Sequence, residues 1–147
     1  MSIFLDIDGI LNREQDWRVK YSLYTPCIDS LSVLADKLGC HEIILSSTWR
    51  ACEGWNEPQF YKNLKDKLKA RGLTVAGTTP VSGHTRGEEI LYYAKRHDCG
   101  KYLILDDDPS LFQNTRDLLL YICNHRKGFT DKDIKAAYKT WVNYWKK

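Results

Sequence analysis

Polar side chains with the chemistry of phosphate and metal sites stand directly after three apolar segments of this chain. Asp6 and Asp8 follow the first segment, Ser46 follows the second, and Asp106 and Asp107 follow a later one. Four carboxylates held close together repel one another, and a bound divalent cation is the simplest relief. Ligands that offer only oxygen favour a hard ion, and Mg²⁺ with one or two carboxylates, water and phosphate fits best. The pattern therefore predicts a magnesium site, provided that the fold brings these segments together.

The elements that must position these residues alternate between strand and helix patterns. Short apolar runs predict five strands, at residues 2–7, 42–46, 73–76, 101–106 and 118–123. Helix patterns and their start and stop signals predict four helices: one opened by an N-cap at Thr25 and Pro26 and ended by Gly39, one from about Pro58 to Gly72, one over 88–97, and a last one opened by a capping box at Thr130 and Asp133. This alternation indicates βαβ units and a mostly parallel sheet that is covered on both faces.

An α/β fold of the Rossmann-like three-layer type would bring the polar strand ends together. In an open parallel sheet, ligands bind beyond the carboxyl ends of the strands, where the strand order reverses. If the order is 3-2-1-4-5, the first and fourth strands are neighbours at that point. The four acids would then converge on one crevice. We expect a single domain over residues 1–147, because the chain contains no internal repeat, linker or low-complexity stretch.

The composition sets broad limits on the function. A chain of 147 residues with 43% hydrophobic and 28% charged residues is typical of one globular domain. No apolar run is long enough to span a bilayer and no signal peptide is visible, so the expected location is the cytoplasm. The net charge of +3 permits a phosphate-bearing partner without requiring one. Five cysteines without a C-x-x-C motif indicate neither a zinc site nor a disulfide framework.

The ordered set of motifs resembles the haloacid dehalogenase-like (HAD) phosphatase superfamily. Residues Asp6 to Leu11 resemble its D-x-D-G-x-L first motif, and Ile43 to Ser46 resemble its second motif, an apolar strand that ends in Ser or Thr. Leu103 to Asp107 resemble the acidic fourth motif. The third motif is a single basic residue on a helix, for which Arg86 fits best and Lys101 is the alternative.

The resemblance implies a role for each of these residues. Asp6 would be the nucleophile that forms an aspartyl-phosphate, and Asp8 would be the general acid and base. Ser46 and the backbone N–H of Ser47 would bind a phosphoryl oxygen, and Arg86 would offset negative charge. Mg²⁺ would be held by Asp6, by the Asp8 carbonyl and by Asp106 with Asp107 close by; either Asp106 or Asp107 could be the direct ligand. The alternatives are that Ser46 is a helix N-cap and that Arg86 forms a surface ion pair with Glu88 or Glu89.

The spacing of the motifs leaves no room for a cap domain. Asp8 and Ser46 are 38 positions apart, and Ser46 and Arg86 are 40 apart, with helices and a strand to place in each interval. An open site suits large substrates such as nucleic-acid ends or phosphoproteins. Residues 12–24 mix basic and aromatic side chains, so Arg13 together with Arg50 could contact phosphates while the aromatic rings stack on bases. The alternative is a flap that packs on its own aromatic residues.

The shorter motifs resemble small HAD domains of nucleic-acid end repair, and also the phosphatase half of polynucleotide kinase-phosphatases. The leading hypothesis from the sequence is an uncapped, Mg²⁺-dependent phosphatase that acts on a nucleic-acid 3′-phosphate or another nucleotide phosphate. A phosphoprotein phosphatase, a small-metabolite phosphatase and a non-catalytic HAD-like binding domain are the alternatives. The sequence leaves the oligomeric state open.

Overall fold

A computed structural model describes residues 1–46, 58–80 and 84–146 of the chain. The strands are β1 (Ser2–Leu5), β2 (Glu42–Leu45), β3 (Thr74–Thr78), β4 (Tyr102–Asp106) and β5 (Leu120–Ile122). The α-helices are α1 (Thr25–Leu38), α2 (Pro58–Lys69), α3 (Arg86–Arg96) and α4 (Asp131–Trp145). The 3₁₀ helices among the described residues are η1 (Glu14–Arg18) and η3 (Pro109–Phe112).

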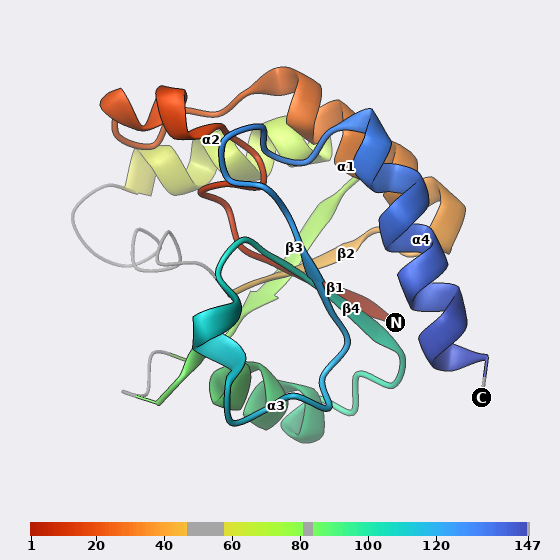
Figure 1. Cartoon of the computed structure of the whole chain (residues 1–147). Helices are drawn as coiled ribbons and strands as arrows, with labels where there is room; N and C mark the ends of the chain where they lie inside the picture. Colours follow the sequence, from red (N-terminus) through yellow and green to blue (C-terminus); the bar gives the residue numbers. More distant parts are fainter. Residues whose placement is uncertain (47–57, 81–83, 147) are drawn as a thin grey trace.

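The five strands form one sheet in the order β3-β2-β1-β4-β5, with every pair parallel, as the sequence predicted. β1 lies at the centre, with Phe4 opposite Ile44 of β2 and Ile104 of β4. Consecutive strands can be parallel only if the chain crosses over between them, and the helices supply these crossovers. The sheet therefore reverses its strand order beside β1, where Asp6 begins the loop that follows (Figure 1).

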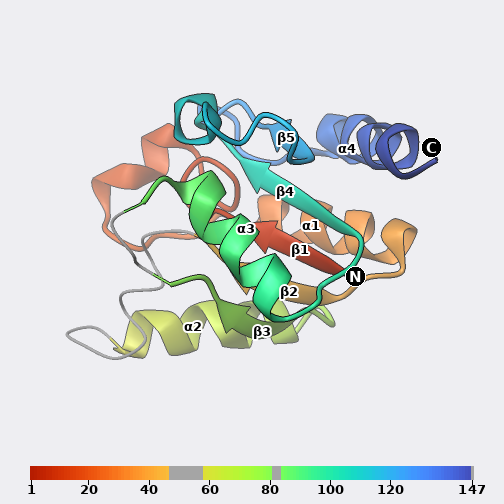
Figure 2. The same ribbon diagram turned by 90° about the horizontal axis from the view of Figure 1, so that it is seen from below.

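Helices cover both faces of the sheet, so the central strands are buried on both sides (Figure 2). The helices α1, α2 and α4 pack on the face that carries Ile3 and Leu5. On the opposite face, Phe4 packs against Ile90 of α3 and Phe112 of η3. This alternation along β1 is the reason that strands of parallel sheets appear as continuous apolar runs in a sequence. The chain is a three-layer α/β fold, and none of the described residues forms a cap domain over it.

The observed element boundaries differ from the predicted ones by a few residues. Tyr24 occupies the N-cap of α1, and Thr25 is the first helical residue rather than the cap. No side chain caps this end, and Pro26 lies in the first turn, where its missing N–H has no helical partner in any case. Gly39 ends the helix in the left-handed conformation, with φ of 66°, as predicted. Most strand ends also shift: β1 stops at Leu5, β2 and β5 stop one residue early, and β3 runs past its predicted end to Thr78.

The capping box predicted for the last helix is confirmed. The carboxylate of Asp133 accepts hydrogen bonds from the Thr130 N–H and hydroxyl, at 2.8 and 3.0 Å. Farther along α4, the indole of Trp145 donates to the carbonyl of Tyr102 at the start of β4 (2.9 Å). Within the described ranges the four cysteines are free thiols, and no helix is long and apolar enough to cross a membrane.

Candidate active site

The strand ladders continue one residue beyond β1 and β2, and this places Asp6 and Ser46 at the same edge of the sheet. The Asp6 N–H donates to the carbonyl of Leu105, and the Ser46 N–H donates to the carbonyl of Leu5, both at 3.0 Å. Asp6 is buried with 5% exposure, and Ser46 is completely buried. The residues after Ser46 lie outside the described part of the chain, so the N-cap alternative for Ser46 is not tested.

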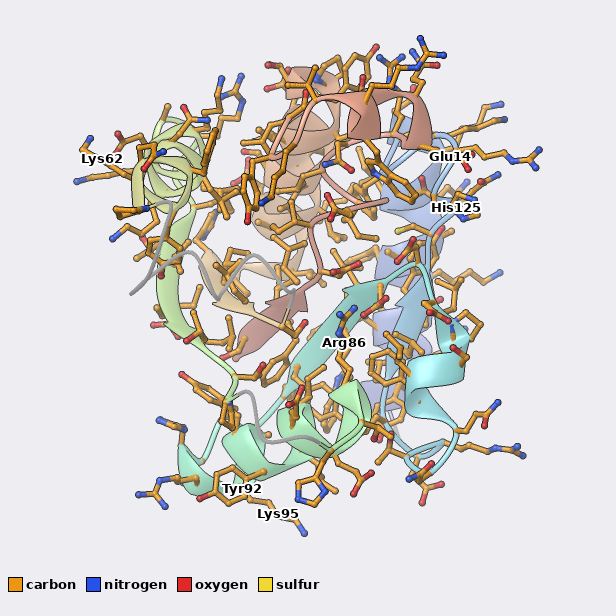
Figure 3. The ribbon with its side chains drawn as sticks, turned by 90° about the vertical axis from the view of Figure 1, so that its left-hand side faces the viewer. Glu14, Lys62, Arg86, Tyr92, Lys95 and His125 are labelled. Carbon is orange, nitrogen blue, oxygen red and sulfur yellow. The ribbon has the colours of Figure 1, made fainter. Side chains whose placement is uncertain are left out.

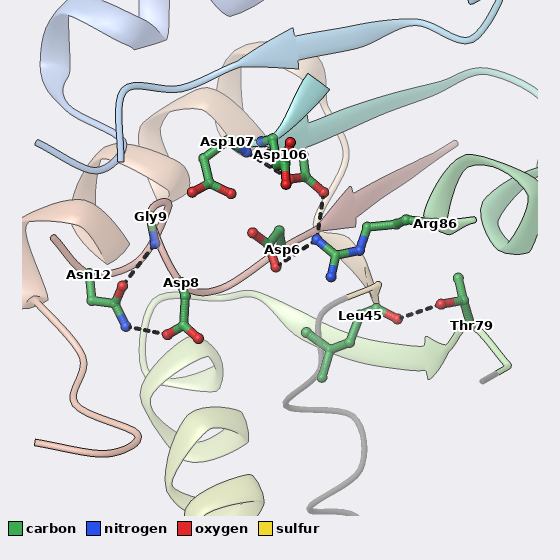
Figure 4. A network of polar contacts seen from close by, with 10 residues as sticks. Asp6, Asp8, Gly9, Asn12, Leu45, Thr79, Arg86, Asp106 and Asp107 are labelled. Carbon is green, nitrogen blue, oxygen red and sulfur yellow. Dashed lines mark hydrogen bonds and ion pairs between the residues drawn. The ribbon is translucent and has the colours of Figure 1, made fainter. Parts of the chain in front are cut away.

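Arg86 joins the acids of two strands. Its Nη1 lies 2.9 Å from Asp106 Oδ2 and 3.3 Å from Asp6 Oδ1 (Figure 4). Arg86 is the first residue of α3, and the hydroxyl of Thr85 caps that helix by accepting from the Glu88 N–H at 3.3 Å. The position at the start of the helix directs the guanidinium toward the carboxyl edge of the sheet.

The alternative residue for the third motif lies elsewhere. Lys101 precedes β4 at the opposite edge of the sheet, and its Nζ lies 5.8 Å from the ring centre of Trp141. The alternative surface pair for Arg86 is not found with Glu88, since that carboxylate accepts from Thr85 and from Asn114 instead. Arg86 is therefore the basic residue that contacts the acids.

Three carboxylates form a cluster that suits a metal ion. Asp6, Asp106 and Asp107 each offer an oxygen, and these oxygens lie within 4.8 Å of one another. Among the described residues one guanidinium contacts this cluster, so full ionisation of the three acids leaves two negative charges, which a divalent cation would balance. The donors are all oxygen, as Mg²⁺ prefers. The residues thus fit a hard divalent ion, and the Asp8 side chain lies outside the cluster.

Burial and mutual repulsion shift the pKa values of the charged groups in this cluster. Burial raises the pKa of Asp6 well above its usual value, and the charge of Asp106 raises it further, while Arg86 opposes the shift. Burial also raises the pKa of Asp106, against the lowering effect of Arg86. Burial alone would lower the pKa of Arg86, but the two carboxylates outweigh burial and raise it. The site therefore binds protons readily wherever no other cation balances its charge.

Asp106 is fixed in place by its own backbone surroundings. It is completely buried, and its Oδ1 accepts from the N–H groups of Asp107 and Asp108 at 2.8 and 3.0 Å. Asp108 turns away to cap η3 by accepting from the Ser110 N–H at 3.0 Å. The three consecutive acids therefore occupy three different positions.

Asn12 holds the loop that carries Asp8, and the sequence analysis had not singled it out. Its Nδ2 donates to Asp8 Oδ1 (2.9 Å) and to the Ser22 carbonyl (2.8 Å). Its Oδ1 accepts from the Gly9 N–H (2.9 Å) and from the indole N–H of Trp17 (2.8 Å). Asn12 is 1% exposed, and these four bonds satisfy its amide fully. Figure 4 shows the two bonds to Asp8 and Gly9. The only local signal for it was an amide three residues after a glycine turn.

Gly9 allows this loop to pass close to the acids. Its φ is +85°, and a Cβ at this position would lie 2.5 Å from Asp107 Oδ2 and 3.0 Å from the Cβ of His125. Any larger residue would be strained by the backbone conformation and would displace the Asp107 carboxylate. Gly9 thus brings Asp107 and His125 to the same turn, and His125 is a second neighbour of the site that the sequence analysis did not identify.

Of the predicted substrate-binding residues, the structure describes Arg13 alone. Arg13 lies in the segment after the first motif, where its guanidinium binds Asp16 (3.0 Å) and stacks 3.6 Å above the ring of Tyr24. Its predicted contact with substrate stays a prediction. Ser47 and Arg50 lie outside the described residues. Thr79, at the end of β3, is a buried polar residue that the analysis missed; its N–H donates to the Leu45 carbonyl at 2.9 Å.

The fold and the site define the class of protein. An all-parallel sheet of order 3-2-1-4-5, with an Asp-x-Asp loop after β1, a buried serine after β2, a basic residue on α3 and adjacent acids after β4, is the arrangement of a HAD-like, phosphatase-like hydrolase. Residues 2–134 match the family described as the HAD domain in Swiss Army Knife RNA repair proteins, and the chain belongs to this family. A search of curated proteins gave no match.

Proposed function

We propose that this chain is a Mg²⁺-dependent phosphomonoester hydrolase that works through an aspartyl-phosphate on Asp6. The observation that carries the proposal is the bridge from Arg86 to Asp6 and Asp106, with Asp107 completing the acidic cluster. A nucleophilic carboxylate needs nearby positive charge if it is to approach a phosphate dianion, and this arrangement supplies a guanidinium and a set of metal ligands.

The first half of the reaction forms the covalent intermediate. A carboxylate oxygen of Asp6 attacks the phosphorus in line, and the bond from phosphorus to the leaving oxygen breaks as the new bond forms. The carboxylic acid of Asp8 gives its proton to the leaving oxygen, so that the product leaves as an alcohol. Arg86 and the hydroxyl of Ser46 hold the equatorial oxygens of the phosphoryl group during this transfer.

The second half releases phosphate. Asp8, now a carboxylate, takes a proton from a water molecule whose oxygen attacks the phosphorus. The bond to Asp6 breaks, so Asp6 returns as a carboxylate and Asp8 as an acid. A bound Mg²⁺, held by Asp6, Asp106, Asp107 and the Asp8 carbonyl, would supply positive charge that offsets the charge on the phosphoryl oxygens.

The favoured substrate is a nucleic-acid 3′-phosphate. The family description refers to RNA repair, and the carboxyl edge of the sheet carries no cap formed by the described residues, which suits a polymer end. We therefore place the substrate among phosphorylated RNA or DNA termini, with nucleotide phosphates as the next class.

Phosphate release from p-nitrophenyl phosphate and from a 3′-phosphorylated oligonucleotide tests this proposal. We expect release that requires Mg²⁺, stops with EDTA and falls about 10³-fold or more in Asp6→Asn, because the nucleophile is lost. Asp36→Asn is the matched control: it removes an exposed carboxylate on α1, and its activity should equal that of the wild type. Equal activity of Asp6→Asn and the wild type would refute the mechanism. A strong preference for the oligonucleotide would support end repair.

A further inference from the structure

We propose that Trp17 and His125 form a stacking subsite for the nucleobase of the terminal nucleotide, beside the phosphate site. The inference rests on the proposed function and names the part of the substrate that this rim would recognise. The indole and imidazole rings are stacked, with centroids 5.9 Å apart and planes inclined by 28°. They come from distant parts of the chain, η1 and the loop after β5, and the sequence alone did not pair them.

Trp17 is the aromatic residue of segment 12–24 whose ring is exposed and can contact a ligand. Tyr24 lies beneath the guanidinium of Arg13, 3.6 Å from ring centre to Cζ. Tyr21 packs against Phe60 of α2, with centroids 4.7 Å apart. Trp17, by contrast, is 42% exposed although its indole N–H is already satisfied. An exposed indole that is held in one orientation presents a flat apolar surface to a ligand at little cost in side-chain entropy.

This pair lies directly beside the acidic cluster. His125 and the carboxylate of Asp107 flank Gly9 so closely that both would touch a Cβ placed there. On the other side, Trp17 is joined to Asp8 through the amide of Asn12. The Glu14 N–H donates to the His125 carbonyl at 2.9 Å, which fixes η1 to the loop after β5. Figure 3 places Glu14 and His125 together at the rim, apart from Arg86 near the centre. A nucleotide with its phosphate at Asp6 would extend its base over this rim.

The charges around the pair suit an uncharged ring with a phosphodiester beyond it. The carboxylate of Glu14 lies 3.8 Å from His125 Nε2 and 3.8 Å from the Nε of Arg126. The Glu14 carboxylate thus offsets the guanidinium of Arg126 beside the rings. Arg126 is 79% exposed and can reach the next phosphodiester outward. Flat aromatic surfaces with a basic side chain nearby are how proteins bind the ends of single strands.

The test compares two 3′-phosphorylated oligoribonucleotides that differ only in the terminal unit, which carries either a base or an abasic site. Binding is measured in the Asp6→Asn background by fluorescence anisotropy, and hydrolysis is measured in the wild type. We expect the base to tighten binding about tenfold, in the range that stacking supplies. Trp17→Leu should bring the ratio close to one, His125→Ala should lower it, and Trp17→Phe, which keeps a ring but not the indole N–H, should retain most of it.

Tyr92→Leu is the matched control, because Tyr92 is a 55% exposed aromatic residue on α3, away from this rim in Figure 3. Its base-to-abasic ratio should equal that of the parent. The proposal is overturned if the parent does not discriminate between the two ends, if folded Trp17→Leu discriminates as the parent does, or if a phosphopeptide binds better than either oligonucleotide. Discrimination in binding without any hydrolysis would leave the subsite standing and refute the proposed function. Hydrolysis of both ends at equal kcat/KM would support the proposed function and refute the subsite.

Discussion

At the scale of single residues, the buried amide of Asn12 is the main support of the proposed general acid. It is the donor to Asp8, and it also accepts from Gly9 and from Trp17. A carboxylic acid must hold its proton within hydrogen-bond reach of the leaving oxygen, so a fixed orientation matters as much as chemical type. Asn12 fixes this orientation from within the loop, where it is 1% exposed.

We predict that Asn12→Ala lowers kcat by about tenfold or more with a smaller change in KM, since Asp8 loses the hydrogen bond from the Asn12 amide. The variant should also lose about 2 kcal/mol of stability, because buried N–H groups lose their acceptor. Asn12→Asp keeps an acceptor for Gly9 and Trp17 but places a second carboxyl group against Asp8 and the Ser22 carbonyl, so its loss of kcat should be at least as large. Steady-state kinetics and urea unfolding measure both quantities. An unchanged kcat in a destabilised Asn12→Ala protein would assign Asn12 a structural role only.

The residues that sequence reasoning identified and those that it missed differ in a physical way. Asp6 and Asp106 follow apolar strands, so the rule for parallel sheets placed them at one edge before any coordinates were known. Asn12 and His125 owe their positions to hydrogen bonds and ring contacts between loops. Such contacts depend on the path of the chain in space, and no periodic pattern in the sequence records them.

At the scale of elements, α3 carries Arg86 to the acids because its first turn packs closely on η3. A Cβ at Gly87 would collide with the hydroxyl of Thr115 and lie 3.1 Å from Phe112 Cδ1. Arg86 is the neighbouring residue, so any shift of this turn moves its guanidinium away from Asp6 and Asp106. The predicted start of this helix, at residue 88, missed the turn because Arg86 and Gly87 give no apolar signal.

We therefore predict that Gly87→Ala reduces kcat/KM by about tenfold, since small displacements of a charged group at a site are costly. The double variant Gly87→Ala/Thr115→Ala removes the colliding hydroxyl and should recover a large part of the loss. Thr115→Ala alone serves as the control and should stay close to the wild type. Rates for p-nitrophenyl phosphate measure all three. A single Gly87→Ala variant with wild-type activity would contradict the proposed packing constraint.

At the scale of the whole molecule, repulsion within the acidic cluster destabilises the folded state until a cation is bound. Asp6, Asp106 and Asp107 lie within 4.8 Å of one another, and one guanidinium balances only part of their charge. A ligand that binds the folded state alone stabilises it by about 2.7 kcal/mol at a concentration one hundred times its Kd. For a chain of this size, that corresponds to a rise in Tm of roughly 5 to 10 °C.

We predict that Mg²⁺ raises the Tm of the wild type by several degrees in differential scanning calorimetry. Asp106→Asn should lose this rise, because the variant lacks a buried carboxylate that would bind the ion. This holds whatever the Tm of the variant is without metal. The control Asp36→Asn should keep the full rise. A wild-type Tm that does not respond to Mg²⁺ at millimolar concentration would argue against a metal site at these acids.

The contact of Gly128 and Phe129 with the first loop also bears on the order in which the protein folds. A Cβ at Gly128 would press on Cys27 Sγ at 2.6 Å and on the Asn12 carbonyl at 2.9 Å, and the Phe129 N–H donates to the Ile10 carbonyl. The residues that close the loop of Asp6 and Asp8 thus stand more than a hundred positions further along the sequence. The first loop can reach its folded form only when this distant segment has docked on it, so the site should form late in folding, together with the packing of the segment that precedes α4.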